Sequence, residues 1–277
     1  MSRDFLKMNG LGNDFVVVAP GDAAFAPTRT MARAIADRST GIGCDQLIGL
    51  ETSRRADAFM RIWNADGGEV AACGNGARCV GWLLMEAKGG DAATIETATG
   101  VLHAWRADGD QVTIDMGPPG LDWRDIPLAW AMDTRTVQLR IDETLEMPGC
   151  VSMGNPHAVF FVSDAEAAAI DRLGPQIEHH WLFPERANVE FAQILDPAHI
   201  RLRVWERGVG ITQACGTGAC ATLVAACRRG LTGRSATLHM DGGPLRVEWR
   251  EADDHVLLTG PVVVDFVGRL PTLEFVA

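Results

Sequence analysis

The sequence predicts an α+β protein built from two pseudo-symmetric domains, in each of which an antiparallel sheet curls around a central apolar helix. Three observations predict this fold: an internal repeat, short apolar and β-branched runs in both copies, and one helix per copy with almost no polar face. The repeat aligns RIWNADGGEVAACGNGA (61–77) with RVWERGVGITQACGTGA (203–219) without a gap, at an offset of 142 residues. The chain is therefore two copies of one module.

The copies extend over roughly 5–118 and 147–261, and an irregular bridge joins them. The bridge contains four prolines: Pro118, Pro119, Pro127 and Pro148. We expect the first domain to comprise residues 1–117 together with a returning C-terminal strand in 265–277. We expect the second domain to comprise residues 118–264.

In the first copy, four apolar and β-branched runs predict strands: 15–18, 59–63, 101–106 and 112–116. An amphipathic helix is predicted over 30–38, with Met31, Ala34 and Ile35 on one face. A second helix follows the CGNG sequence, is apolar almost all round, and is expected to end at Gly89-Gly90. Because a helix without a polar face must be covered on every side, the strands are expected to wrap around it.

The second copy repeats this order. Strands are predicted over 158–162 and 201–205, and an amphipathic helix over 164–173. The apolar helix that follows CGTG contains residues 221–226, and Gly230 is expected to end it.

Charge and hydropathy limit the classes of partner. The chain carries 25 basic and 36 acidic residues, a formal net charge of −11, which repels phosphate backbones, so we expect no nucleic-acid partner. Asp4 and Lys7 lie where a signal peptide needs an apolar run, and no stretch approaches the ~18 apolar residues of a membrane span. We therefore expect a cytoplasmic protein with a small-molecule substrate and no membrane partner.

The seven cysteines are odd in number and are expected to be thiols in a reducing compartment. Two pairs, Cys73 with Cys79 and Cys215 with Cys220, lack histidines at ligand spacing and fit no zinc template, so we expect no metal. The chain has only two lysines, which leaves few positions for a pyridoxal Schiff base.

Cys73 and Cys215 occupy equivalent positions of the repeat, each at a predicted strand-to-helix turn. A helix N-terminus leaves its first amides unbonded and carries partial positive charge, so it is expected to lower the pKa of a thiol and to offer an anion site. One such cysteine is more often an inert core residue, but its duplication favours reactivity. Packing is the better interpretation for the other five: Cys44, Cys79, Cys150, Cys220 and Cys227.

Two related domains would bring these two thiols to opposite sides of one active-site cleft. Inverting a stereocentre by proton transfer needs a base on one face and an acid on the other, and a matched pair of thiols runs the reaction both ways. The α-hydrogen of an amino acid is too weakly acidic for a thiol alone. Amides of both helix N-termini directed at the α-carboxylate would stabilise the carbanion, so no electron-sink cofactor is required.

At these residues the chain resembles the diaminopimelate epimerase family, pyridoxal-independent enzymes that interconvert LL- and meso-diaminopimelate in lysine and peptidoglycan precursor synthesis. The matching motifs cover essentially the whole chain: MNGLGNDF (8–15), NADG with CGNGARC (64–79), GNPH (154–157), NVEF (188–191) and WERGVGITQACGTGAC (205–220). The resemblance implies a homodimer and no cofactor.

The resemblance also implies roles for individual residues. Cys73 and Cys215 would be the proton donor and acceptor, and His157 and Glu206 would modulate the thiol pKa values. Substrate-binding positions are implied at eleven residues: Asn13, Gln46, Asn64, Gly74, Asn75, Asn155, Asn188, Glu206, Arg207, Gly216 and Thr217. The charge pair Glu206-Arg207 complements the distal ammonium and carboxylate of a bis-amino acid.

Two departures from the family pattern stand out. Ile211 occupies a position where the family usually has Glu, beside the turn that carries Glu206. The chain has no Tyr, and Phe266 stands where a Tyr commonly makes the dimer contact, which keeps the ring and loses the hydroxyl hydrogen bond.

Three other functions compete with this one. A proline or hydroxyproline epimerase also uses paired cysteines, but its substrate has no distal end for Glu206-Arg207 to bind. A thiol redox protein would use one cysteine as the peroxidatic centre and the other as resolver. A non-catalytic amino-acid-binding protein would need the same carboxylate amides but would not need cysteine at both turns.

Overall fold

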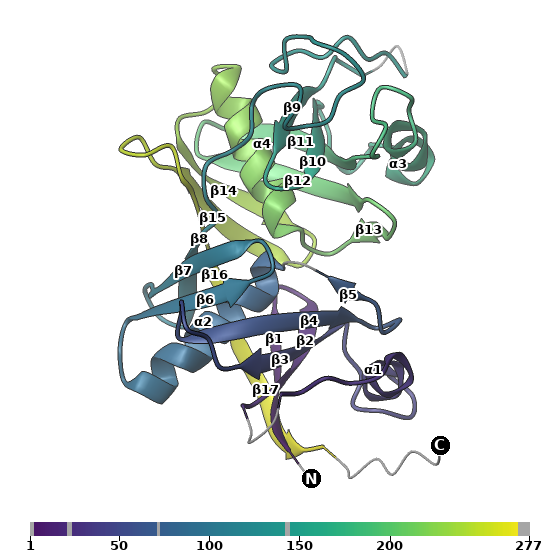
Figure 1. Ribbon diagram of the computed structural model, residues 1–277. Helices are drawn as coiled ribbons and strands as arrows, with labels where there is room; N and C mark the ends of the chain where they lie inside the picture. The colour runs from purple at the N-terminus through teal and green to yellow at the C-terminus, as the bar shows by residue number, and fades with distance from the viewer. Residues whose placement is uncertain (1–2, 21–23, 71–72, 142–144, 271–277) are drawn as a thin grey trace. The chain divides into compact units, whose positions relative to one another are not determined.

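The structure is a computed structural model that describes residues 3–20, 24–70, 73–141 and 145–270. The chain divides into two compact units, Met1–Ile114 with Gly260–Ala277, and Asp115–Thr259. The fold class expected from the sequence is confirmed: each unit is a strand-rich α+β structure with one buried helix (Figure 1). The part of the expected C-terminal strand beyond Leu270 lies outside the described residues.

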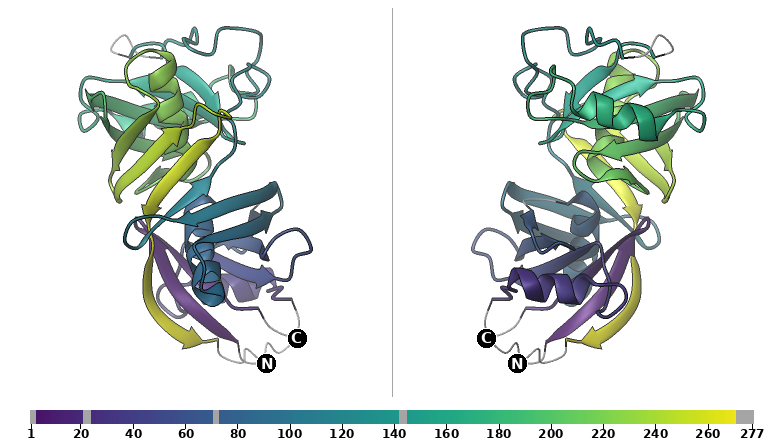
Figure 2. Two further views of the ribbon diagram at one scale, coloured as in Figure 1. Left: turned by 90° about the vertical axis from the view of Figure 1, so that its left-hand side faces the viewer. Right: turned by 90° about the vertical axis from the view of Figure 1, so that its right-hand side faces the viewer.

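The described residues of the first unit form α1 (Arg29–Ala36), α2 (Gly74–Lys88) and nine strands. Its strands are β1 (Asp4–Gly10), β2 (Asn13–Val18), β3 (Gln46–Glu51), β4 (Ala58–Asn64), β5 (Glu69–Val70), β6 (Ala92–Thr97), β7 (Gly100–Arg106), β8 (Gln111–Asp115) and β17 (Val263–Arg269). β1 pairs antiparallel with β2, the next strand in the chain, and with β17, which lies beside it although it comes from the other end of the sequence (Figure 2).

In the second unit, the part of the chain that the structure describes forms α3 (Ile170–Glu178), α4 (Gly216–Arg228) and eight strands. Its strands are β9 (Gly149–Ser152), β10 (Pro156–Phe161), β11 (Asn188–Asp196), β12 (His199–Glu206), β13 (Gly210–Thr212), β14 (Ser235–Met240), β15 (Gly243–Trp249) and β16 (Val256–Pro261). β14, β15 and β16 form an antiparallel meander, as β6, β7 and β8 do in the first unit.

The sheets are mixed, whereas the sequence suggested antiparallel pairing alone. β2 runs parallel to β3 and β4 to β6, and the second unit repeats this with β10 beside β11 and β12 beside β14. Parallel neighbours need a crossover segment, and each of the four described helices lies in one of these crossovers. The pairing direction therefore follows from the helix positions in the chain.

The two buried helices begin and end as the sequence predicts. α2 ends at Gly89, whose φ of 64° is the left-handed conformation that favours glycine, and α4 is followed by Gly230 with a φ of 71°. Residues 75–81 of α2 and 218–226 of α4 are buried. At Gly81 an added Cβ would lie 2.7 Å from the Cβ of Ala104 in β7, so only glycine lets the sheet approach α2 this closely.

The amphipathic helices differ from their expected ranges. α1 begins after the Thr28 cap, whose side chain accepts from the amide of Met31, and ends before Asp37. The range expected for α3 was wrong at its start, because Asp164 Oδ1 accepts from the amides of Glu166 and Ala167 and holds a turn there instead. The helix begins at Ile170 and continues past Leu173 to Glu178.

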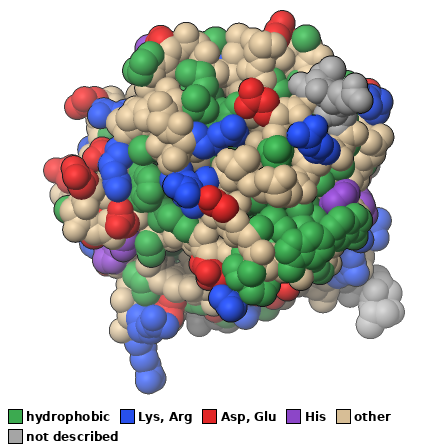
Figure 3. Space-filling view, turned by 90° about the horizontal axis from the view of Figure 1, so that it is seen from above, with side chains coloured by type: hydrophobic (Ala, Val, Ile, Leu, Met, Phe, Trp, Pro, Cys, Tyr) green, Lys and Arg blue, Asp and Glu red, His purple; other side chains and the backbone are tan. Residues whose placement is uncertain are grey.

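Unit 2 also exposes large aromatic side chains. The rings of Trp130 and Trp181 stack with centroids 4.6 Å apart, and both are exposed. Figure 3 shows hydrophobic side chains gathered into patches among charged ones on the face that it views. Neither tryptophan belongs to the expected site.

No described helix is both long enough and apolar enough to cross a membrane.

Candidate active site

Cys73 lies at the N-cap of α2, with an extended backbone. Its Sγ accepts from the amide of Gly76 at 3.4 Å, so the thiol lies over the open amides of the first helical turn. The Oδ1 atom of Asn13 lies 3.9 Å from Sγ and accepts from the thiol. The expected position of Cys73 at a strand-to-helix turn is confirmed.

Three strand ends bring amide side chains to this half-site. Asn13 begins β2, Gln46 begins β3, and Asn64 ends β4. Gln46 and Asn64 are antiparallel partners, and Gln46 Nε2 donates to Asn64 Oδ1 at 2.9 Å. Asn75, in the first turn of α2, donates through Nδ2 to Asn13 Oδ1 at 3.4 Å. Asn13 and Asn75 therefore lie beside Cys73, and the register of β3 and β4 pairs Gln46 with Asn64.

Two acceptor atoms of this half-site are buried without a hydrogen-bond partner among the described residues. They are Gln46 Oε1 and Asn75 Oδ1. A buried carbonyl oxygen without a donor costs stability unless something supplies that donor. An ammonium group is a ligand of the kind that these oxygens would accept from.

Cys215 repeats the arrangement at the N-cap of α4. Its Sγ accepts from the amide of Gly218 at 3.4 Å and lies 3.5 Å from Oγ1 of Thr217. Asn155 Nδ2 donates to the same Thr217 hydroxyl at 3.3 Å. At the repeat offset of 142, Cys215, Asn155 and Thr217 are the counterparts of Cys73, Asn13 and Asn75.

A buried His–Glu hydrogen bond underlies the Cys215 half-site. His157 is fully buried in β10, and its Nδ1 lies 2.6 Å from Oε1 of Glu190, which is also fully buried. The other ring nitrogen, Nε2, lies 3.0 Å from Asn155 Oδ1 and donates to it. Parallel pairing with Asn188 places His157 inside the sheet.

The turn after β12 carries the expected charge pair. Glu206 ends the strand, and its Oε1 accepts from the hydroxyl of Thr212 at 2.5 Å. Asn188 Oδ1 accepts from the amide of Arg207 at 2.9 Å. The Arg207 guanidinium is exposed and donates to the carbonyl of Glu185 at 2.8 Å. Asn188 thus fixes the backbone of the turn, and the two charged side chains point to different surroundings.

The two half-sites differ in charge beneath their helices. Glu190 is the repeat counterpart of Ile48, and His157 is the counterpart of Phe15. A Cβ built on Gly218 would lie 2.9 Å from Glu190 Oε1, and one built on Gly76 would lie 2.9 Å from Ile48 Cδ1. The same position under the cysteine turn is therefore apolar in the first unit and ionisable in the second.

This difference overturns the expectation that the helix N-terminus lowers the thiol pKa at Cys215. Burial raises the pKa of Cys215 well above its ordinary value, and the carboxylates of Glu206 and Glu190 raise it further. Burial also raises the pKa of Glu206 and of Glu190. The helix terminus acts over about one turn, and here it is outweighed by desolvation and by two nearby acids.

Sequence reasoning missed two glutamates that support this half-site. Glu190 had a signal, since an acidic residue between Val189 and Phe191 interrupts an apolar strand. Glu178 had none. It is buried at the end of α3, where its carboxylate accepts from the indole of Trp205 at 2.8 Å and from the amide of Gly208 at 3.0 Å. It therefore holds both sides of the Glu206-Arg207 turn.

The remaining expected positions lie as follows. Gly74 and Gly216 are the first residues of α2 and α4. Phe266 lies in β17, where it is exposed and packs edge-to-face on Phe5. Ile211 is exposed in β13. Among the described residues, no group of three His, Cys, Asp or Glu side chains is arranged to hold a metal ion.

Solved structures with similar folds are only distantly related in sequence. A hydroxyproline epimerase from Agrobacterium vitis superposes with a TM-score of 0.67 at 19% identity, covering 97% of this chain and 91% of that chain. A Bacillus anthracis protein of the PhzF family, assigned to phenazine biosynthesis, superposes with a TM-score of 0.69 at 16% identity, covering 98% and 99%. At these identities the likeness shows the fold alone.

Sequence relatives are much closer. Diaminopimelate epimerase from Phenylobacterium zucineum is 62% identical over 274 residues, which are 98% of this chain and 99% of the relative. Diaminopimelate epimerase from Rhodospirillum centenum is 58% identical, covering 98% and 93%. The family model described as diaminopimelate epimerase matches residues 5–121 and 149–264. With both repeat copies matched and identities near 60% over nearly its full length, the chain belongs to the diaminopimelate epimerase family.

Proposed function

We propose that this protein interconverts LL- and meso-diaminopimelate by moving the α-proton between Cys73 and Cys215, with no pyridoxal cofactor. The observation that carries the proposal is that a thiol caps the buried helix of each repeat copy at the same position. Membership of the diaminopimelate epimerase family supports the substrate and the reaction.

In this mechanism one cysteine, as the thiolate, takes the α-proton and becomes a thiol. The other, as the thiol, gives its proton to the opposite face of the carbon and becomes the thiolate. Inversion is complete, and the two sulfurs have exchanged protonation states. Burial raises the pKa of Cys215, which supports the assignment of this residue as the proton donor in the substrate-free enzyme.

The carbanion formed between these two steps needs stabilisation. The open amides at the starts of α2 and α4, near Gly74, Asn75, Gly216 and Thr217, are the donors available for the α-carboxylate. The partnerless oxygens of Gln46 and Asn75 would accept from an ammonium group of the substrate. Glu206 and Arg207 offer opposite charges to the distal ammonium and carboxylate.

The test follows solvent hydrogen during a short incubation with LL-diaminopimelate in heavy water. A thiol holds one proton, so the removed hydrogen stays on the first sulfur while the second delivers deuterium. We expect meso product labelled at its new stereocentre from the first turnovers and recovered LL substrate almost unlabelled. Chiral separation followed by mass spectrometry measures both isomers.

The same assay with trans-4-hydroxy-L-proline serves as the control substrate, because it has no distal amino-acid group. We expect no turnover of it. Meso product that retains the original α-hydrogen would refute the two-thiol mechanism, and absence of any meso product would refute the substrate.

We further propose that the protein works as a homodimer in the cytoplasm. Support for the dimer comes from β17, where three apolar side chains, Val263, Phe266 and Val267, are 47%, 49% and 68% exposed. Support for the compartment comes from the mechanism, which requires both cysteines to stay reduced.

Sedimentation measures the oligomeric state. We expect the dimer mass for the wild type and the monomer mass for F266D, because a charge at an apolar contact disfavours association. The control L195D places the same charge on another exposed apolar residue, in β11, and should remain dimeric. A monomeric wild-type protein would contradict this assignment.

A further inference from the structure

The equivalent asparagines of the two half-sites, Asn13 and Asn155, have side-chain amides of opposite orientation relative to the cysteine. In the second unit, the Nε2–H of His157 donates to Asn155 Oδ1, so the amide NH₂ of Asn155 faces Thr217 and the Cys215 side. In the first unit, Asn13 Nδ2 donates to Asp45 Oδ2 at 2.9 Å, and the oxygen of Asn13 faces Cys73. Asp45 has no acidic counterpart in the second copy, where the equivalent position is Ala187.

A carboxylate can only accept hydrogen bonds, so it determines the orientation of the Asn13 amide. Asp45 Oδ2 accepts from Asn13 Nδ2 and also from the backbone amide of Asp14 at 3.0 Å. The Asn13 oxygen is then directed away from Asp45, toward Cys73 and the Asn75 amide. If the Asn13 amide turned over, its oxygen would face the negatively charged carboxylate of Asp45. The hydrogen bonds of Asn13 with Asp45, Cys73 and Asn75 would all be lost.

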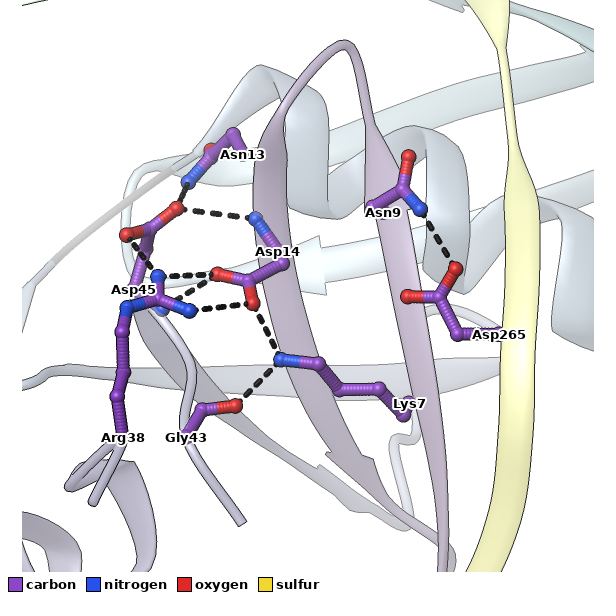
Figure 4. Close-up of polar contacts among 8 residues, drawn as sticks. All are labelled: Lys7, Asn9, Asn13, Asp14, Arg38, Gly43, Asp45 and Asp265. Carbon is purple, nitrogen blue, oxygen red and sulfur yellow. Dashed lines mark hydrogen bonds and ion pairs between the residues drawn. The ribbon is translucent and has the colours of Figure 1, made fainter.

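A charge network surrounds Asp45 (Figure 4). Arg38 donates to Asp45 Oδ1 at 2.7 Å and to both oxygens of Asp14, at 2.8 and 2.9 Å. The nearly buried Lys7 pairs with Asp14 and donates to the carbonyl of Gly43. The amide of Asp45 in turn donates to Asp14 Oδ1 at 2.9 Å. Two cations and two carboxylates thus tie the start of β2 to the start of β3.

We propose that Asp45 is a positioning residue for the Cys73 half-site, which acts by fixing the Asn13 amide so that its oxygen faces the thiol. In this role Asp45 acts through Asn13 rather than on the thiol or the substrate. The relay runs from Asp45 to Asn13 and from Asn13 to Cys73, and it belongs to the first copy alone. This inference rests on the proposed function for its effect on catalysis, but the relay itself can be measured without substrate.

The first measurement is the rate at which iodoacetamide alkylates Cys73 at neutral pH, followed by peptide mapping in a C215A background. An oxygen acceptor beside a thiol favours S–H over the thiolate, which is the reactive form. In D45A the Asn13 amide is free to turn its NH₂ toward sulfur, so we expect alkylation about three- to tenfold faster. In N13A, adding D45A should change the rate no further, since the relay is already broken.

The second measurement is kcat/KM for diaminopimelate in the wild-type cysteine background. We expect D45A to lower it about tenfold, the effect of one lost charge-assisted hydrogen bond. D45N should stay within about threefold. We expect the NH₂ group that D45N introduces to face the exposed Arg38, where it meets one donor. If it faced Asn13 instead, it would meet two donors, the Asn13 amide and the backbone amide of Asp14.

The matched control is R38A, which breaks the ion pairs of Asp45 and Asp14 but leaves the contact between Asp45 and Asn13. We expect its alkylation rate and kcat/KM to match the wild type, with a loss only in thermal stability. If D45A fails to fold by circular dichroism, D45S replaces it, since serine is too short to reach Asn13.

Three results would overturn the proposal. One is a D45A protein with unchanged alkylation and kcat/KM. Another is a kcat/KM for R38A that falls as far as that of D45A, which would mean that Asp45 is only a member of a structural charge cluster. The last is an undiminished effect of D45A in the N13A background, which would mean that its charge acts on Cys73 directly. If the alkylation results agree with the relay while no epimerisation occurs, the proposed function fails and the relay stands.

Discussion

Replacing either Cys73 or Cys215 by alanine is expected to lower kcat for diaminopimelate at least about a thousandfold in both directions, while leaving the fold intact. Each thiol is one half of a donor and acceptor pair, and a methyl group can neither hold nor deliver a proton. Both residues cap helices through sulfur. Each Sγ is a weak acceptor, 3.4 Å from the backbone nitrogen that donates to it, so loss of the cap should cost little stability.

Chiral chromatography of the reaction, started from LL and separately from meso substrate, measures this loss. The control is C227S, a partly buried cysteine near the other end of α4, which should keep wild-type turnover. Near-normal turnover in both directions by either alanine variant would exclude the two-thiol mechanism, whatever the behaviour of the other.

Removing His157 is expected to destabilise the protein by about 3–5 kcal/mol at pH 8, because H157L leaves the fully buried Glu190 without its partner. Burial already raises the pKa of Glu190 above 4.5, and His157 is the group that opposes this rise. Without His157 the folded-state pKa lies higher still. The carboxylate form must then be buried unpaired or must take up a proton.

The sign of the pH dependence follows from that shift. A carboxyl whose folded-state pKa exceeds its unfolded-state pKa contributes stability below about pH 4.5 and loses it as the pH rises through the folded-state value. Urea unfolding of H157L should therefore give a lower free energy of unfolding at pH 8 than at pH 5.5. In H157L/E190Q the carboxyl is absent, and this difference should disappear.

Comparison of the single and double variants isolates Glu190, because every other titrating group is common to both. If the free energy of unfolding changes between pH 5.5 and pH 8 by the same amount in H157L and in H157L/E190Q, Glu190 is not the group that His157 stabilises.

Much of the fold could be predicted because its signals are local. The repeat offset of 142 residues aligns positions that proved structurally equivalent, such as Gln46 and Asn188, which each begin the second strand of a parallel pair. The ends of α2 and α4 were predictable from Gly89 and Gly230, since helix termination depends on a few neighbouring residues. The start of α3 was not, because Asp164 offered the backbone a competing turn.

The amino-acid sequence by itself therefore determined the duplicated α+β architecture, the buried helices and the placement of Cys73 and Cys215 at their N-termini. Only the tertiary structure decided what surrounds each thiol. Whether strands pair in parallel, and whether Glu190 or Ile48 lies under a cysteine, depends on contacts between distant segments. Burial and those contacts reverse the pKa shift that a helix N-terminus alone would give Cys215, because desolvation in a folded interior outweighs a local dipole.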